Sequence, residues 1–430
     1  MPERARSTLR FLRVPLPLRG YGANMAAGRT QQQQVPVVVV GESLNALGIL
    51  RSLAGRGIAL HVVATTRWCG PGLSRHVASI EIVPALDGRA LVDGLKTLAR
   101  RLEVRAVLML CGDRQVDAVN DHRDELAPLF RITLPSAQML RTLANKASFQ
   151  PFALLHGLDV PRTAVIEAGQ PVGTAMRELT LPLVLKPADK AQVLNGHAER
   201  AVRVQTRAEA EAVAARMLAG AGCVVAQEWI VGDDSDIYFV LFVCDADSRV
   251  VGMFSGRKLV CDPPGVGSTG ICVDAGEHSA ALAREALRFI QASGYCGIGS
   301  VEYKRDRRTG RFVIVEPTVG RSDWQEEIAT QCGVNLPLQA YLAECGLPPE
   351  PPRPMGAPQA WSASLFYPRP PLPEGTRVRD GYLRPSDPLP GLHHYLVEEL
   401  WRRARRRLAR ALNRTPQPAV EGVVAHKARP

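Results

Sequence analysis

Two acidic residues lie in adjacent strand-like segments of the C-terminal half. Glu302 falls in residues 300–303 and Glu316 in residues 312–316, and the polar residues 306–310 between them have the composition of a turn. The two carboxylates could share one divalent ion, because magnesium prefers oxygen ligands from a few carboxylates and nucleotide phosphates. A surface hairpin whose acids face water is equally compatible with this segment alone.

Length and composition indicate a folded chain of more than one domain. The chain has 430 residues, of which 46% are hydrophobic and 22% charged, close to the averages of globular proteins. No apolar run approaches the ~18 residues of a membrane-spanning helix, so none is expected. Nine cysteines without regular spacing argue against a disulfide framework or a zinc site and favour a reducing, cytoplasmic location.

The net charge of +11 is concentrated at the two ends of the chain, before residue 20 and in residues 401–414. A nucleic-acid-binding protein more typically places basic residues among aromatic ones on a folded face, so no specific nucleic-acid partner is expected. A nucleic-acid binder driven by these ends is kept as a rival hypothesis. Residues 1–34 are interpreted as a disordered extension, and Met25 is favoured over Met1 as the natural start.

Alternating strand and helix patterns predict a doubly wound parallel α/β domain over residues 35–135. The turn at Gly41 lacks the full Gly-x-Gly-x-x-Gly pattern, so a dinucleotide site is disfavoured. This turn either holds an anion on its amides or is purely structural. The expected strands are 35–40, 58–64, 79–83, 106–111 and 131–134, and the expected helices begin after Gly41 and cover 88–102 and 115–126.

After Pro135 the pattern changes to mixed α+β packing, predicted over residues 136–346. Dense prolines at 348–354 then indicate a linker or an extended wrapping segment. A third region, residues 347–430, combines this segment with a basic helix expected at 389–412. Within residues 136–346 the expected helices are 136–156, 208–218 and 278–292, and the expected strands are 181–187, 223–230, 237–245, 250–255 and the two of the acidic hairpin.

Several motifs, taken in order, resemble those of the ATP-grasp superfamily of carboxylate–amine ligases. Residues 145–149 and 156–163 resemble the lysine-containing helix and the entry to the first ATP subdomain. Residues 183–187 resemble the strand whose lysine faces the nucleotide phosphates, and residues 225–232 resemble the hinge that receives adenine. The acidic hairpin matches the family's metal carboxylates. The resemblance covers about residues 35–346, implies an α/β domain followed by an ATP-grasp fold, and is strongest to a poorly characterised bacterial branch.

The resemblance also implies the roles of individual residues, with ATP and Mg²⁺ as cofactors and Mn²⁺ as an alternative ion. The nucleotide would be held by two lysines, by the hinge and by two ribose-facing aspartates, and the substrate side by basic residues. The implied nucleotide-binding residues are Lys146, Lys186, Gln227, Glu228, Trp229, Ile230, Asp234 and Asp236; the implied metal ligands are Glu302, Glu316 and Thr318; the implied catalytic residues are Arg321, Lys258 and Arg257.

The chain departs from the family's pattern at the second carboxylate. The family commonly has Glu-x-Asn-x-Arg, whereas this chain has Glu316 followed by Thr318 in the asparagine position, with one extra residue before Arg321. A threonine hydroxyl still offers magnesium a neutral oxygen.

Each of these residues also has a structural interpretation. Lys186 ends an apolar strand, where its ammonium either meets a phosphate or extends to water. The aspartates at 233–236 are typical of a polar turn, and Arg257 with Lys258 could form an ordinary exposed pair. Trp324 is interpreted as a core residue in preference to a substrate wall.

The implied function is an ATP- and Mg²⁺-dependent ligase that activates a small-molecule carboxylate as an acyl phosphate for attack by an amine. Whether it forms a homodimer is left open. The alternative is a nucleotide-binding regulatory protein that keeps the fold without ligase turnover. Thr318 and the glycine-poor residues 188–199, where relatives often have a phosphate lid, favour this alternative.

Overall fold

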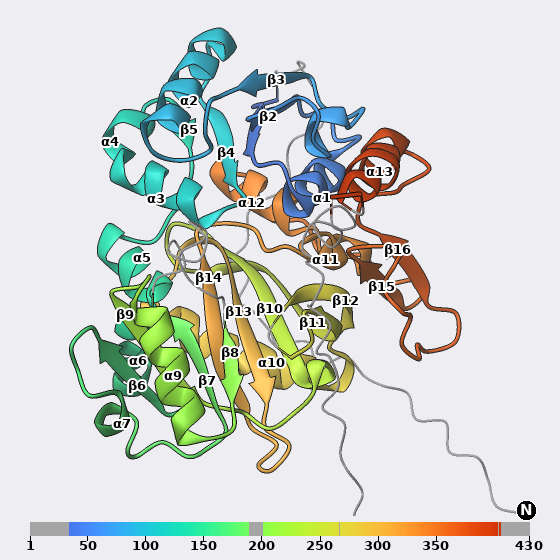
Figure 1. Ribbon diagram of the computed structural model, residues 1–430. Coiled ribbons are helices and arrows are strands. Elements are labelled where there is room, and N and C mark those ends of the chain that lie inside the picture. The colour runs from blue at the N-terminus through green and yellow to red at the C-terminus, as the bar shows by residue number, and fades with distance from the viewer. Residues whose placement is uncertain (1–33, 189–200, 266, 403, 406–430) are drawn as a thin grey trace, which may run out of the picture. The chain divides into compact units, whose positions relative to one another are not determined.

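The structure is a computed structural model that describes residues 34–188, 201–265, 267–402, 404 and 405 (Figure 1). Three predictions therefore lie outside the described residues: the disordered extension, almost all of the lid segment and the last part of the basic helix. Within the described residues, no helix has the length and apolar composition needed to cross a membrane.

The N-terminal domain is a parallel sheet, as predicted, and its five strands lie in the order β3-β2-β1-β4-β5 (Figure 1). All four valines of β1 are buried, because alternate side chains pack against the cores formed with α1 and with α2. The strands are β1 (Val37–Val40), β2 (Leu60–Ala64), β3 (Ser79–Ile82), β4 (Ala106–Leu110) and β5 (Phe130–Arg131), and the helices are α1 (Leu44–Leu53), the short η1 (Pro71–Leu73), α2 (Gly88–Leu102), α3 (Asp113–Asp121) and α4 (Arg123–Leu126).

The turn after β1 is held by close packing and hydrogen bonds within the N-terminal domain. Gly41 has φ +152°, and a Cβ at this position would lie 2.8 Å from the Cβ of Cys111 on the neighbouring strand's end. The carboxylate of Glu42 accepts hydrogen bonds from the hydroxyl of Thr65 at 2.7 Å and from the amide of Thr66 at 3.2 Å. These contacts support the structural interpretation of this turn.

A four-stranded sheet in the order β6-β9-β7-β8 follows, with antiparallel pairing throughout. The helix predicted over residues 136–156 is broken at Asn145, whose side chain accepts hydrogen bonds from the amides of Ala147 and Ser148 and so caps the second helix. The elements here are α5 (Ala137–Ala144), α6 (Lys146–Leu155), β6 (Thr163–Glu167), α7 (Val172–Ala175), β7 (Leu183–Pro187), β8 (Val202–Val204), α9 (Arg207–Leu218) and β9 (Cys223–Glu228).

A seven-stranded sheet in the order β14-β13-β10-β11-β12-β15-β16 forms the largest layer. The acidic hairpin is present as its first two strands, and β11 extends well beyond the predicted strand at 250–255. The elements are η2 (Asp234–Asp236), β10 (Ile237–Cys244), β11 (Val250–Asp262), β12 (Ser268–Asp274), η3 (Gly276–His278), α10 (Ser279–Ser293), β13 (Gly297–Arg305), β14 (Phe312–Val319), α11 (Glu327–Gln331) and α12 (Leu336–Glu344).

The proline-dense segment leads into strands of this same sheet. β15 (Gln359–Ser362) pairs with β12, and β16 (Arg377–Asp380) pairs with β15. The chain then forms α13 (Pro388–His393), which lies beside α1 in Figure 1, and continues into a π-helical turn, η4 (His394–Glu398). The segment therefore wraps onto the preceding domains.

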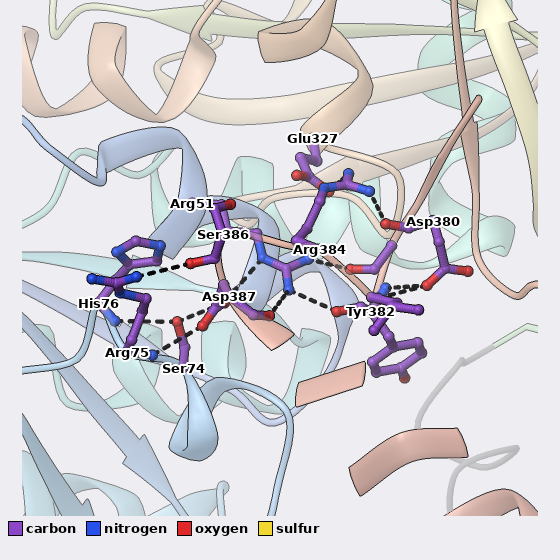
Figure 2. Close-up of polar contacts among 12 residues, drawn as sticks. Arg51, Ser74, Arg75, His76, Glu327, Asp380, Tyr382, Arg384, Ser386 and Asp387 are labelled. Carbon is purple, nitrogen blue, oxygen red and sulfur yellow. Dashed lines mark hydrogen bonds and ion pairs between the residues drawn. The ribbon is translucent and has the colours of Figure 1, made fainter. Parts of the chain in front are cut away.

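Buried charges attach this C-terminal segment to the N-terminal domain (Figure 2). The carboxylate of Asp387, which is 1% exposed, accepts hydrogen bonds from the Arg51 side chain at 3.2 Å, the Ser74 hydroxyl at 3.0 Å and the Arg75 amide at 3.0 Å. Arg384 pairs with Glu327 at 2.9 Å nearby. Burial lowers the pKa of Arg51 below its ordinary value, and the charges of Glu327 and Asp387 oppose that shift.

Replacing Asp387 with alanine is expected to destabilise the protein by about 3–5 kcal/mol, because it leaves the buried Arg51 without its carboxylate. The free energy of unfolding from urea titration measures this loss. Asp247→Ala is the matched control, since that side chain is 68% exposed and its partner Arg249 lies at the surface. A loss at Asp387 no larger than that of the control would contradict the assignment of these charges as the attachment.

Candidate active site

A cavity of about 290 Å³ is lined by residues of both sheets that follow the N-terminal domain, and by Asp113 from α3. Five cationic and five acidic side chains line it, so the cavity holds many charged groups but little net charge. These residues are Lys146, Lys186, Lys258, Lys304, Arg321, Asp113, Glu228, Glu302, Glu316 and Asp323.

The acidic hairpin places its two carboxylates on the same side of the sheet. Glu302 on β13 is directly opposite Glu316 on β14, and both line the cavity. The pairing shifts by one residue immediately after this pair, so Val315 is an extra residue on β14. This bulge explains how Val315 and Glu316, which would face opposite sides of a regular strand, both line the cavity.

Each carboxylate of this pair contacts a lysine from another element. Glu316 lies 3.5 Å from the ammonium of Lys146, at the start of α6, and Glu302 forms an ion pair with the buried ammonium of Lys258 on β11. Burial lowers the pKa of Lys258, but the charge of Glu302, the hydrogen bond to it and the charges of Cys261 and Asp323 together more than offset that shift, so the net pKa lies above the ordinary value and the lysine stays charged.

Glu302, Glu316 and Thr318 would hold a magnesium or manganese ion only if a bound ligand supplied further oxygen atoms. Glu302, Glu316 and Thr318 supply hard oxygen atoms to the cavity. Among the described residues, however, no group of three or more His, Cys, Asp or Glu side chains could hold an ion. Magnesium commonly takes one or two carboxylates and completes its shell with water and substrate phosphates, which matches this incomplete set.

The opposite wall of the cavity is built from the smaller sheet and its exit. Lys186 on β7 and Gln227 on β9 line it, and Gln227 donates a hydrogen bond to the Thr163 hydroxyl at 3.2 Å. The amides of Glu228 and Trp229 donate to the carbonyls of Arg162 and Pro182, both at 2.9 Å. The N–H groups of these two residues therefore already have backbone acceptors within the protein. A purine edge at this hinge would have to use the remaining backbone groups, including those of Ile230.

Lys304 is a cavity residue that the sequence analysis did not select. It lies two residues after Glu302 on β13 and so faces the same side. Its side chain is 5% exposed, and its ammonium lies 3.9 Å from the centre of the Trp229 ring with no hydrogen-bond partner among the described residues. Burial lowers the pKa of Lys304 to about 8.

Arg321 reaches the cavity while paired with the N-terminal domain. Its guanidinium donates to both carboxylate oxygens of Asp113, at 2.6 and 3.3 Å. Burial lowers its pKa, the charge of Asp113 raises it, and the net pKa lies above the ordinary value. Asp113 begins α3 just after the carboxyl end of β4, a position where parallel sheets commonly place functional groups, and this signal could have identified it from sequence.

Three predicted residues do not line the cavity, and the structure gives them other partners. Asp234 accepts hydrogen bonds from the amides of Cys261 at 2.9 Å and Gly265 at 2.6 Å. Asp236 pairs with Arg307 at 2.6 Å, and Arg257 donates to the carbonyl of Ser235 at 2.6 Å. These contacts hold the loops around η2, so the two aspartates and Arg257 are best described as supports of the cavity rim.

The loop after β14 closes the remaining side. Asp323 accepts a hydrogen bond from the Ser300 hydroxyl at 2.9 Å, and Gln325 accepts one from the Thr269 hydroxyl at 3.1 Å. Trp324, expected in the core, both packs against the core that includes β1 and lines the cavity. Its indole N–H is buried without a hydrogen-bond partner among the described residues.

Comparison with known proteins gives one sequence relative and many structural ones. No protein-family model matches the sequence. The chain is 23% identical over 314 residues to a D-aspartate ligase of Enterococcus faecium, covering 70% of this chain and 74% of that protein. The ADP complex of an N5-carboxyaminoimidazole ribonucleotide synthetase aligns with a TM-score of 0.60 and 16% identity over 75% of this chain and 81% of that chain.

An L-amino acid ligase from Bacillus licheniformis aligns with a TM-score of 0.55 and 16% identity, over 72% of this chain and 75% of that chain. At these identities the structural matches establish the fold. The parallel α/β domain followed by two sheets around a charged cavity agrees with that fold, and the sequence match spans most of both proteins. The chain therefore has the ATP-grasp fold, and its sequence relative is a carboxylate–amine ligase.

Proposed function

We propose that this protein is an ATP- and Mg²⁺-dependent ligase that joins a small-molecule carboxylate to an amine. In this reaction an oxygen of the substrate carboxylate attacks the terminal phosphorus of ATP and ADP leaves. The amine nitrogen then attacks the carbonyl carbon of the acyl phosphate, phosphate leaves, and the amine loses a proton. The observation that carries the proposal is the cross-strand pair of Glu302 and Glu316 in a cavity also lined by Lys186.

The protein's own contribution would be positioning and neutralisation of charge. A magnesium ion bound between Glu302 and Glu316 would supply a charge that polarises the phosphate oxygens. Lys146 at the start of α6 and Lys186 on β7 would hold the phosphates, and Arg321 would offset the negative charge that develops on the transferred group. Since no covalent enzyme intermediate is required, the cavity needs no activated nucleophile.

We infer an amino acid as one of the two substrates. Two relatives support this class, because one is a D-aspartate ligase and another an L-amino acid ligase. The cavity is lined by both cationic and acidic side chains, which a zwitterion requires. The reducing environment that nine free cysteines favour is consistent with the cytoplasm, where ATP is available.

Release of ADP in the presence of ATP, Mg²⁺ and pooled D- and L-amino acids tests the proposal. The expected result is ADP release that depends on the pool, together with a condensed amide product detected by mass spectrometry. Tight binding of ATP without release of ADP by any pool would instead favour the regulatory alternative. Failure to bind ATP at all would overturn both interpretations.

Replacing Lys304 with methionine is expected to weaken nucleotide binding about tenfold and to stabilise the free protein by about 1–3 kcal/mol. The buried ammonium lacks a hydrogen-bond partner among the described residues, so its desolvation destabilises the folded protein. A bound nucleotide would supply the missing acceptor. Isothermal titration with ADP and urea unfolding measure the two effects. Unchanged affinity in the methionine variant would remove Lys304 from the nucleotide site.

The pH dependence gives a separate test of Lys304. Its pKa of about 8 means that the free protein loses this charge as pH rises, so affinity for ADP should fall roughly tenfold or more between pH 7.5 and 9.5. The unfolded chain keeps the proton up to the ordinary pKa of 10.5, so this group makes the folded state more stable as pH rises from about 8 to 10.5. Lys304→Arg, which stays charged, should flatten the binding profile.

A further inference from the structure

Asp323 differs from the other acidic side chains of the cavity in its partners. The four others form ion pairs: Asp113 with Arg321, Glu228 with Arg162, Glu302 with Lys258 and Glu316 with Lys146. Within the part of the chain that the structure describes, the carboxylate of Asp323 accepts hydrogen bonds only from uncharged donors. These are the Ser300 hydroxyl at 2.9 Å, the Trp324 amide at 2.9 Å and the side-chain amide of Gln325 at 3.2 Å. Asp323 therefore lines the cavity in a fixed position and without an ionic partner.

These hydrogen bonds leave the carboxylate of Asp323 able to bind a cation in the cavity. An ionised carboxylate has about four acceptor positions, and the donors named above occupy fewer than that. The donors offset part of the cost of removing the charge from water, but they do not neutralise it. Arg321 and Lys258 line the same cavity, yet their side chains already bind Asp113 and Glu302. An ammonium group on a ligand would supply both the missing charge and a further donor.

Strand β13 shows where Asp323 lies relative to the rest of the cavity. Ser300, Glu302 and Lys304 alternate along this strand and so face the same side, with about 7 Å between successive members. Lys304 lies against Trp229 at the hinge, Glu302 belongs to the carboxylate pair, and Ser300 binds Asp323. The cavity therefore runs in order from the hinge, past the paired carboxylates, to Asp323.

This order matches the geometry that the proposed reaction needs, and the inference rests on that proposed function. With adenine at the hinge and the ion at the carboxylate pair, the acyl phosphate would form beside the pair, and the amine would approach from the side away from ADP. We propose that Asp323 binds the ammonium group of the amine substrate there and directs its nitrogen toward the acyl carbon. A role for Asp323 as a third metal ligand fits less well, because no group of three or more His, Cys, Asp or Glu side chains in the described ranges could hold an ion.

Binding of amino acid amides to the protein loaded with ADP and Mg²⁺ tests this role without turnover. The probe is a pool of D- and L-amino acid amides at pH 6.5. These compounds carry an ammonium, since an α-amino group has a pKa of about 7.7–8.0, but they have no carboxylate that could be activated. The pool should raise the Tm of the wild-type complex. Asp323→Asn should bind the amides about tenfold to hundredfold more weakly, because a neutral side chain replaces the charged acceptor.

Product formation separates a role in positioning the amine from a structural role. In the amino acid pool, Asp323→Asn should lower formation of the condensed amide about hundredfold. Hydroxamate formed when hydroxylamine replaces the amine should fall no more than about threefold, because hydroxylamine is largely uncharged at pH 7.5 and needs no anionic site. Asp323→Glu keeps the charge but moves it by one methylene. This variant should bind the amides within about threefold of wild type and lower product formation about tenfold.

Asp245→Asn is the matched control. Asp245 also accepts hydrogen bonds from two backbone amides, both at 2.9 Å, but it does not line the cavity, so its replacement should change none of these measurements. Absence of amide binding to the wild-type ADP complex, or equal binding to Asp323→Asn, would overturn the role of Asp323. Loss of ADP affinity in Asp323→Asn together with amide binding would do so too, since it marks a structural role. Amide binding that only the Asp323 variant loses, without ADP release from any amino acid pool, would support the ammonium site and reject the ligase reaction.

Discussion

Glu316→Gln is expected to reduce ATP turnover by about a thousandfold, roughly 4 kcal/mol of transition-state stabilisation. The substitution keeps the shape of the side chain but leaves the ion with one carboxylate, and it removes the ionic partner 3.5 Å from Lys146. The loss should appear in kcat, because the phosphate contacts of Lys146 and Lys186 remain. Steady-state ADP release, with ADP affinity measured separately, distinguishes the two effects.

The control for this variant is Glu277→Gln, whose side chain is 88% exposed and does not line the cavity. It should leave turnover unchanged. Glu316 is 30% exposed, so its loss should change stability little, and unfolding measurements can exclude a folding defect. Normal turnover in Glu316→Gln would end the assignment of the acidic hairpin as the metal site.

Lys186→Met is expected to lower kcat/KM for ATP by about a hundredfold to a thousandfold. The side chain lies on β7, across the cavity from the hairpin, where methionine keeps the apolar stem but loses the charge offered to the phosphates. Most of the effect should appear as a higher KM if the lysine contacts bound ATP in the ground state. A fall confined to kcat would place its contact in the transition state.

Lys96→Met is the matched control for Lys186, because Lys96 forms a partly exposed ion pair with Glu125 at 2.7 Å in the N-terminal domain. The control should change neither kcat nor KM. If Lys186→Met retained normal kinetics with ATP, the smaller sheet would have no part in phosphate binding, whatever the outcome at Glu316.

The sequence predicted elements whose signals are local. The valines of β1, the alternation of strand and helix after it, and the acidic hairpin could be recognised because side-chain period and turn residues specify them directly. The single helix expected at 136–156 shows the limit of this approach. The break at Asn145 depends on a capping side chain and places Lys146 at the start of a helix, beside Glu316.

Other elements had weak local signals and form through pairing with distant strands. β12, β15 and β16 are stabilised by neighbours in the seven-stranded sheet, so a proline-dense segment became part of that sheet and then of the buried network around Asp387. The family resemblance implied that the aspartates of η2 bind ribose, whereas in the structure Asp234 accepts hydrogen bonds from loop amides and Asp236 pairs with Arg307. The sequence identifies a charged side chain, but the folded structure decides which group it contacts.

The sequence by itself therefore predicted the order of the domains and the paired carboxylates from neighbouring residues, and the resemblance to a known family added Lys146, Lys186 and Lys258. Only the tertiary structure brought Asp113 to Arg321 and held the ammonium of Lys304 over Trp229. Those arrangements join residues far apart in sequence. Their energies come from burial and charge pairing, which no local pattern encodes.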